Sequence, residues 1–216
     1  MASRSRPLSL TILVTGFGPF PGAPFNPTGA MVERLARLRR PALADIKIIA
    51  HVFPTSYAAV DRELPRLIAK HKPRALLMFG LAARTKSLRI ETRARNALAL
   101  LPDVSGQSLH RNSILPGGPA VLALPGQTQS LFTSARNARV PVKQSRDAGR
   151  YLCNYLCWRA AEASLKNEGP RLATFVHVPA IPRAVRPKSK QHRLTIDDLT
   201  RAASGILLAL AAAARR

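Results

Sequence analysis

The stretch LTILVTGFGPFPGAPFNPT, residues 10–28, decides the fold class. Its first part is a short apolar run rich in β-branched residues, which is typical of a strand buried on both faces, so we expect a strand over Ser9–Thr15. The prolines and glycines that follow indicate a shaped loop without regular structure. The residues N-P-T at 26–28 then favour the start of a helix. Apolar residues recur on one face of that helix at Met31, Leu35 and Leu38.

Strand and helix patterns go on alternating toward the C-terminus. Further strands are expected at Ile46–Val52, at Ala75–Phe79 closed by Gly80, at 140–142 and at Leu172–Val178. Helices are expected at Tyr57–Lys70, Gln127–Asn137, about Gly149–Leu165, and from the Thr195 cap to Ala213. This order predicts a single-domain α/β protein over residues 1–216, a three-layer α/β/α sandwich around a mostly parallel sheet.

The middle of the chain is less regular. Residues 88–100, LRIETRARNALAL, fit either a strand or an extended arm. Residues 102–125 are rich in Pro, Gly and Ser and predict a long loop. Loops of this length inside a compact domain are usually functional or mobile. Residues 182–193, PRAVRPKSKQHR, predict a basic loop.

The charge balance is unusual. Lys and Arg number 34, of which 26 are Arg, against 11 acidic residues, so the formal net charge is +23. A field of that size attracts nucleic acids and anionic membranes. The arginines are scattered, however, and aromatic residues are not interleaved with them as a stacking platform requires. We favour solvated basic faces with no dedicated nucleic-acid or membrane partner, and keep a basic nucleic-acid-binding protein as an alternative.

Several classes of protein are excluded. The two cysteines, Cys153 and Cys157, lie four residues apart and provide no disulfide framework. No zinc-ligand spacing, dinucleotide-binding glycine motif or phosphate-binding loop is present, so we do not expect a dinucleotide-binding or P-loop enzyme. The uncharged segment 7–32 is interrupted by prolines and glycines, and no convincing cleavage signal follows it. We therefore expect a soluble, cytoplasmic protein.

Cys153 is the first candidate for chemistry. It lies in the first turn of a helix that Ser145 or Asp147 is expected to cap, where the helix dipole favours negative charge. The thiolate is the nucleophilic form of cysteine. A free cysteine is also commonly a small buried hydrophobe, and this is what we expect of Cys157.

His177 and Glu91 are the other candidates. His177 is at the C-terminal end of a strand that Pro179 terminates, where ligand sites collect in α/β sheets, although a lone histidine there also fits the core. Glu91 is one of few acids; it could pair with Arg89, Arg93 or Arg95, or orient an imidazole. Together the three residues could form a thiol-hydrolase triad. The nucleophile-elbow motif of α/β-hydrolases is absent.

Four segments carry a resemblance to a known family. They are VTGFGPFPGAPFNPT at 14–28, GLAARTKSLRIETRARN at 80–96, DAGRYLCNYLCW at 147–158 and FVHVPAIP at 175–182. Together they resemble pyroglutamyl peptidase I, a family of cysteine peptidases, and the likeness covers nearly the whole chain. The gaps of 62 residues from Glu91 to Cys153 and 24 from there to His177 also fit.

The resemblance implies an omega-peptidase that removes an N-terminal pyroglutamyl residue from peptides, without metal or cofactor. It implies that Cys153 attacks the carbonyl carbon, that His177 accepts and returns the proton, and that Glu91 orients His177. Backbone amides near Cys153 would bind the oxyanion. The residues that it implies for the lactam pocket are Phe17, Phe20, Asn26, Tyr151 and Leu152. Family members commonly form homo-oligomers, as dimers or tetramers.

The chain departs from the family in three places. After Asn96 the family usually has an acidic residue and an Arg, which is assigned to support of the tetrahedral intermediate, but here residues 97–101 read ALALL. Thr92 stands where the family commonly has Arg, and Pro21-Gly22 replaces paired glycines. These departures keep open a family member with changed or lost peptidase activity.

Overall fold

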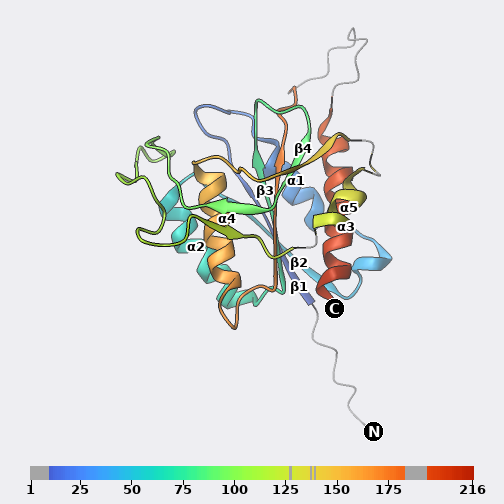
Figure 1. Ribbon diagram of the computed structural model, residues 1–216. Helices are drawn as coiled ribbons and strands as arrows, with labels where there is room; N and C mark the ends of the chain where they lie inside the picture. Colours follow the sequence, from blue (N-terminus) through green and yellow to red (C-terminus); the bar gives the residue numbers. More distant parts are fainter. Residues whose placement is uncertain (1–9, 127, 137, 139, 183–193) are drawn as a thin grey trace.

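The computed structural model describes residues 10–126, 128–136, 138, 140–182 and 194–216 (Figure 1). Its main sheet has six strands in the order β2-β1-β3-β8-β4-β7. The strands are β1 (Leu10–Phe17), β2 (Ile46–Phe53), β3 (Ala75–Leu81), β4 (Leu88–Glu91), β7 (Val142–Ser145) and β8 (Leu172–Val178). Neighbouring strands are parallel except β4 and β8, which are antiparallel. A separate antiparallel pair consists of β5 (Arg93–Arg95) and β6 (Val121–Ala123).

Helices cover both faces of the sheet, which confirms the three-layer α/β/α architecture (Figure 1). One face carries α1 (Pro27–Ala36), α3 (Thr128–Arg136) and α5 (Ile196–Ala214). The other carries α2 (Tyr57–His71) and α4 (Leu152–Ser164). A short 3-10 helix, η1 (Pro41–Leu43), precedes β2.

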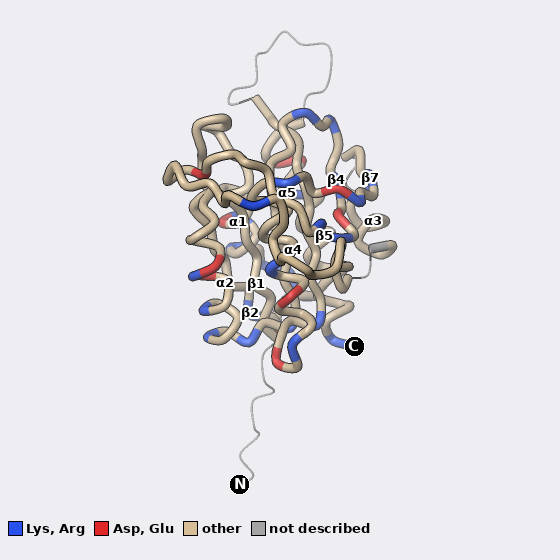
Figure 2. The backbone as a smooth tube through the Cα atoms, turned by 60° about the vertical axis from the view of Figure 1, so that its left-hand side comes forward, with Lys and Arg blue, Asp and Glu red and all other residues tan. Residues whose placement is uncertain are grey.

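The central strands are buried on both sides, as their continuous apolar sequence predicts. In β1, Ile12 and Val14 pack toward α1 and α5, while Leu13 packs toward α2 and α4. In β3, Leu77 and Leu76 divide between the two cores in the same way. None of the described Lys and Arg residues is buried. They are spread over most of the chain, and they are far more numerous than the acidic residues (Figure 2).

The helix boundaries follow local chemistry. Thr195 caps α5 reciprocally with Asp198, so the expected start of this helix is confirmed. By contrast, α4 begins at Leu152 and not near Gly149, and the expectation that Ser145 or Asp147 caps it is wrong. The Asp147 carboxylate instead accepts from the Gly149 N–H, and Gly149 adopts φ +84°, a left-handed conformation that ends the turn before the helix can begin.

One smaller expectation is corrected, and another is not tested by the structure. The strand expected at 140–142 is β7, which begins at Val142 because it pairs with β4 over Leu88–Glu91. The basic loop expected at 182–193 lies almost wholly outside the described residues. In the described part of the chain no helix is long and apolar enough to cross a membrane.

Candidate functional site

Glu91 and His177 form a buried pair at the junction of β4 and β8. The Nδ1 atom of His177 lies 2.8 Å from Oε1 of Glu91, and the two residues are 5% and 2% exposed. An ionised carboxylate can only accept, so Nδ1 donates this hydrogen bond. The other Glu91 oxygen, Oε2, has no hydrogen-bond partner among the described residues. The carboxylate therefore fixes the tautomer and orientation of the ring.

Cys153 joins this pair from α4, in the helix layer that covers one face of the sheet. Its side chain, half-buried at the start of α4, lies close enough to the side chain of His177 to raise the pKa of that ring. Burial lowers the pKa of His177, but the Cys153 sulfur and the Glu91 carboxylate raise it by more, so that the pKa of His177 lies at about 9. The site therefore favours an imidazolium ion at His177 near neutral pH.

Gly80 makes room for the sulfur. A Cβ atom at Gly80 would lie 2.6 Å from Sγ of Cys153 and 2.6 Å from Cζ of Phe175. Gly80 is paired with His177 in the β3–β8 register, and the Phe175 ring packs edge-on against the His177 ring at 5.0 Å. A residue without a side chain is thus required for the sulfur to reach the imidazole.

Cys157 has a different environment one turn further along α4. It is fully buried, and burial raises the pKa of its thiol. This confirms the expectation that Cys157 belongs to the core.

The first turn of α4, which carries Cys153, has no capping side chain at its N-cap. The side chain of its N-cap, Tyr151, makes no capping hydrogen bond. The first N–H groups of a helix have no partner within the helix. These donors therefore remain free of a capping side chain on the same turn as Cys153, where an oxyanion would form.

Asn154 anchors the start of α4 to the segment that contains Arg95 and Ala97. Its fully buried side chain accepts from the Arg95 N–H at 2.9 Å and donates to the carbonyls of Arg95 and Ala97 at 2.8 and 3.0 Å. Three backbone groups are thereby satisfied by one amide, which fixes β5 against the turn that carries Cys153.

The loop after β1 is held by Asn26. This residue caps α1 by accepting from the Thr28 N–H, and its amide donates to the Gly18 carbonyl at 3.1 Å. Phe20 pairs through its backbone with Ala23, and its side chain is half-exposed. The loop is therefore a shaped element, as the sequence predicted.

A second loop, residues 97–107, lies across the start of α4. The Tyr151 hydroxyl donates to the Pro102 carbonyl at 2.9 Å, and the Val104 N–H donates to Thr55, whose hydroxyl bonds Gly18. Asp103 fixes the loop to α2 by accepting from the amides of Tyr57, Ser105 and Gln107. Burial raises the pKa of Asp103, but the Ser56 side chain and these backbone amides together lower it by more. The two loops and Tyr151 thus form one connected rim.

The structure places the residues expected from sequence in two groups. Glu91, Cys153 and His177 come together, while Phe20 and Tyr151 keep exposed surface on the rim. Phe17 and Leu152 are 2% and 1% exposed and pack in the core beneath them. Sequence reasoning missed three residues that position the site, namely Gly80, Asp103 and Asn154. The position of Asn154 directly after Cys153 was the available signal.

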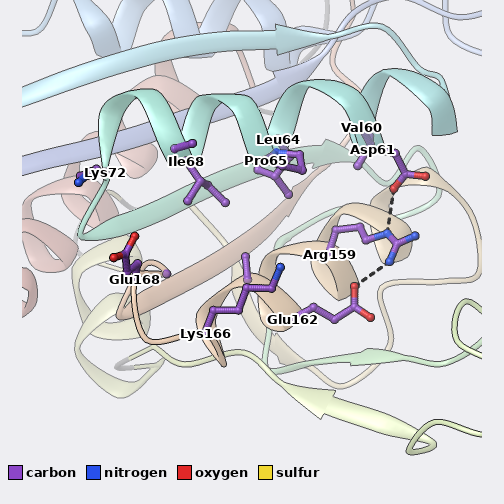
Figure 3. Close-up of a pocket in the computed structure, with 13 residues that line it drawn as sticks. Val60, Asp61, Leu64, Pro65, Ile68, Lys72, Arg159, Glu162, Lys166 and Glu168 are labelled. Atoms are coloured by element: carbon purple, nitrogen blue, oxygen red, sulfur yellow. Dashed lines mark hydrogen bonds and ion pairs between the residues drawn. The ribbon is translucent and has the colours of Figure 1, made fainter.

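A hollow of about 550 Å³ elsewhere on the surface is separate from these residues (Figure 3). It lies between α2 and α4, with apolar side chains such as Leu64 and Ile68 and a charged group formed by Asp61, Arg159 and Glu162. None of Glu91, Cys153 and His177 lines it. The described residues hold no group of three or more side chains suited to a metal ion.

Comparison with known proteins gives one consistent result. Residues 10–216 match the model of the family described as pyroglutamyl peptidase. A pyrrolidone-carboxylate peptidase of Pyrococcus furiosus is 29% identical over 83% of this chain and 85% of its own, and one of Pseudomonas fluorescens is 30% identical over 81% and 80%. The structure of a mutant pyrrolidone carboxyl peptidase from Pyrococcus furiosus matches with a TM-score of 0.82 at 25% identity, over 93% of this chain and 98% of that one. The enzyme from Thermococcus litoralis matches with a TM-score of 0.82 over 93% of each chain.

Proposed function

Because this chain belongs to the pyroglutamyl peptidase family, we propose that it is a cysteine omega-peptidase that hydrolyses the amide bond after an N-terminal pyroglutamyl residue. The observation that carries the proposal is the buried Glu91–His177 pair with the sulfur of Cys153 beside the same imidazole, at Gly80 of the neighbouring strand. A carboxylate, an imidazole and a thiol in this order are the groups that nucleophilic acyl transfer requires.

The reaction begins with the Cys153 thiolate. Its sulfur forms a bond to the pyroglutamyl carbonyl carbon, and the carbonyl electron pair moves to the oxygen, which the first amides of α4 stabilise. Collapse of this intermediate breaks the C–N bond as the His177 imidazolium gives its proton to the leaving amine. Water then attacks the thioester while His177 takes a proton from it. Pyroglutamate leaves, and the thiolate–imidazolium pair is restored.

Phe17, Phe20, Asn26, Tyr151 and Leu152 form the lactam site in this proposal. A flat, uncharged ring needs apolar walls and a few hydrogen bonds. Phe20 and Tyr151 have the exposed surface to contact it directly, while Phe17 and Leu152 support them from the core. The Asn26 side chain is occupied by Gly18 and Thr28, so the backbone of this loop is the source of hydrogen bonds to the lactam.

A second candidate is a family member with altered substrate use. It is favoured by residues 97–101, where no Arg is present and where Leu100 and Leu101 are 64% and 55% exposed. Apolar side chains at this rim could accept a different acyl group while the catalytic groups remain in place. A panel of N-terminally blocked and unblocked amides distinguishes the two candidates.

The test is hydrolysis of a fluorogenic pyroglutamyl amide by the purified protein. We expect turnover that iodoacetamide abolishes and that Cys153→Ser reduces by about 10³-fold or more. Cys157→Ala is the matched control and should retain activity, since its thiol is buried one turn away. A folded protein that releases no amine from this substrate, or a fully active Cys153→Ser variant, contradicts the proposal.

We also propose that residues 1–216 form one domain, that the chain assembles as a homo-oligomer, and that it acts in the cytoplasm. Both cysteines are free, and a thiol nucleophile needs the reducing conditions found there. Light scattering across a concentration series tests the assembly.

A further inference from the structure

A basic groove of about 780 Å³ lies beside the Glu91–His177 pair. We call it the arginine groove, and the residues that carry the argument are Arg89, Arg93, Arg95, Arg146 and Asp147. They come from β4, β5 and the segment after β7, which lie together in the structure (Figure 2). Four guanidinium groups and one carboxylate give this surface a strong positive charge next to the reaction site.

The groove begins at the catalytic residues on two sides. Arg89 is directly opposite His177 in the β4–β8 register, and its Nε lies 3.7 Å from Oε1 of Glu91. On the other side, the backbone of Arg95 is bonded to Asn154, the residue after Cys153. A peptide that leaves the sulfur therefore passes close to this surface.

A second hollow extends the positive surface along the edge of the sheet. It measures about 480 Å³ and is lined by residues 82–85 and by Arg89, which it shares with the arginine groove. The Ala82 N–H is bonded to the Val178 carbonyl, next to His177 in sequence. Arg84 adds a further cation there.

The guanidinium groups of Arg93 and Arg95 keep donors for a ligand, whereas that of Arg89 is held by Ser145, the Asp147 carbonyl and Glu91. Nε of Arg93 donates to the Arg146 carbonyl, and Arg95 pairs with Asp147 at 3.2 Å. Each guanidinium has five N–H donors in a planar fork that matches a carboxylate. Asp147 remains ionised because the Gly149 amide and Arg95 lower its pKa against the effect of burial. Two carboxylates, Asp147 in the groove and Glu91 beside Arg89, do not neutralise four arginines.

We propose that the arginine groove binds acidic side chains in the peptide segment that follows the pyroglutamyl residue, so that the enzyme prefers acidic substrates. This inference rests on the proposed function. None of the residues that line the groove is aromatic, so it offers no platform on which nucleic-acid bases could stack. Carboxylates in an extended peptide match both its charge and its position beside the scissile bond.

The experiment compares three amidated peptides, pyroglutamyl-Ala-Glu-Glu, pyroglutamyl-Ala-Gln-Gln and pyroglutamyl-Ala-Lys-Lys. We expect kcat/KM for the Glu peptide to exceed that for the Gln peptide about tenfold at low salt, chiefly through KM, and the ratio to shrink between about 20 and about 200 mM salt. The Lys peptide should be the poorest substrate. The neutral fluorogenic amide reports separately on the proposed function.

Two double variants isolate the groove. Arg93→Gln with Arg146→Gln should bring the Glu-to-Gln ratio close to one. Arg66→Gln with Arg171→Gln removes the same charge from residues outside the groove and should leave the ratio unchanged. Thermal unfolding midpoints confirm that each variant is folded.

Three results overturn the inference. The first is an equal kcat/KM for the Glu and Gln peptides while the neutral amide is hydrolysed. The second is a single-stranded oligonucleotide that binds the parent and not the groove variant while no acidic preference exists, which would make the groove a nucleic-acid surface. The third is absence of turnover of every pyroglutamyl substrate, which removes the proposed function itself.

Discussion

Replacement of Gly80 by Ala tests whether the sulfur is positioned by the sheet. The added Cβ would meet Sγ of Cys153 and Cζ of Phe175 at 2.6 Å each, whereas carbon contacts are favourable at about 3.5–4.0 Å. Both neighbours must therefore move by about 1 Å. Overpacking of this kind costs about 1–3 kcal/mol of stability. Displacement of a reacting group by about 1 Å costs about 100-fold in rate.

The assay measures kcat and KM on a neutral pyroglutamyl amide together with urea unfolding. Gly29→Ala is the matched control, because its Cβ would make ordinary contacts of 3.5 Å or more with Val52 and Phe17. It removes a glycine from the interior of α1 and should not lower stability. We expect Gly80→Ala to lose rate mainly in kcat. A Gly80→Ala variant with unchanged kcat and stability refutes the reasoning.

Three further predictions concern His177, Asn154 and Thr195. Because the pKa of His177 is raised to about 9, the imidazolium persists below that pH, and kcat/KM should fall as the pH rises through about 9. Glu91→Gln removes a carboxylate that raises this pKa, so the descending limb of the pH profile should move to lower pH. A descending limb that stays in place contradicts the role of Glu91. Asn154→Ala leaves backbone groups of Arg95 and Ala97 unpaired in a buried site and should cost about 2–3 kcal/mol in urea unfolding; a loss below the error of the measurement would show that water replaces the amide. Thr195→Ala removes the reciprocal cap of α5 and should cost about 1 kcal/mol, with no change in kcat.

Much of the fold could be predicted because local and global signals agree. The apolar run of β8 is bounded by polar residues and Pro179, and its predicted limits Leu172–Val178 are those observed. The Thr195 cap fixed the start of α5. The start of α4 could not be predicted in this way, because the Asp147 side chain is used in a turn with Gly149 and no capping side chain replaces it.

The residues that we propose to react could be predicted from the sequence, but the residues that position them could not. Glu91, Cys153 and His177 are chemically distinctive residues, and a family resemblance brought them together. Gly80 could not be singled out, because its importance is a distance to a sulfur 73 residues away in the sequence, at Cys153. The arginine groove likewise depends on the placement of β5 near Arg146 and Asp147, in the segment after β7. Scattered arginines in the sequence do not reveal that four of them converge.

The geometry of β4 explains why the acid and the base meet so closely. Because β4 runs antiparallel to β8, Glu91 is opposite Phe175 and points to the same face as His177, two residues further along β8. Strand register thus places the two side chains together, and no loop has to become ordered to bring them into contact. A buried ionisable pair adds little to stability and often costs folding free energy. A glycine at position 80 also gives up the packing that a side chain would provide. Both costs serve the position of one sulfur, which accords with a site maintained for reaction. The departure at residues 97–101 concerns the rim, so its consequence should be a changed acyl preference or a lower kcat with the thiolate–imidazolium pair intact.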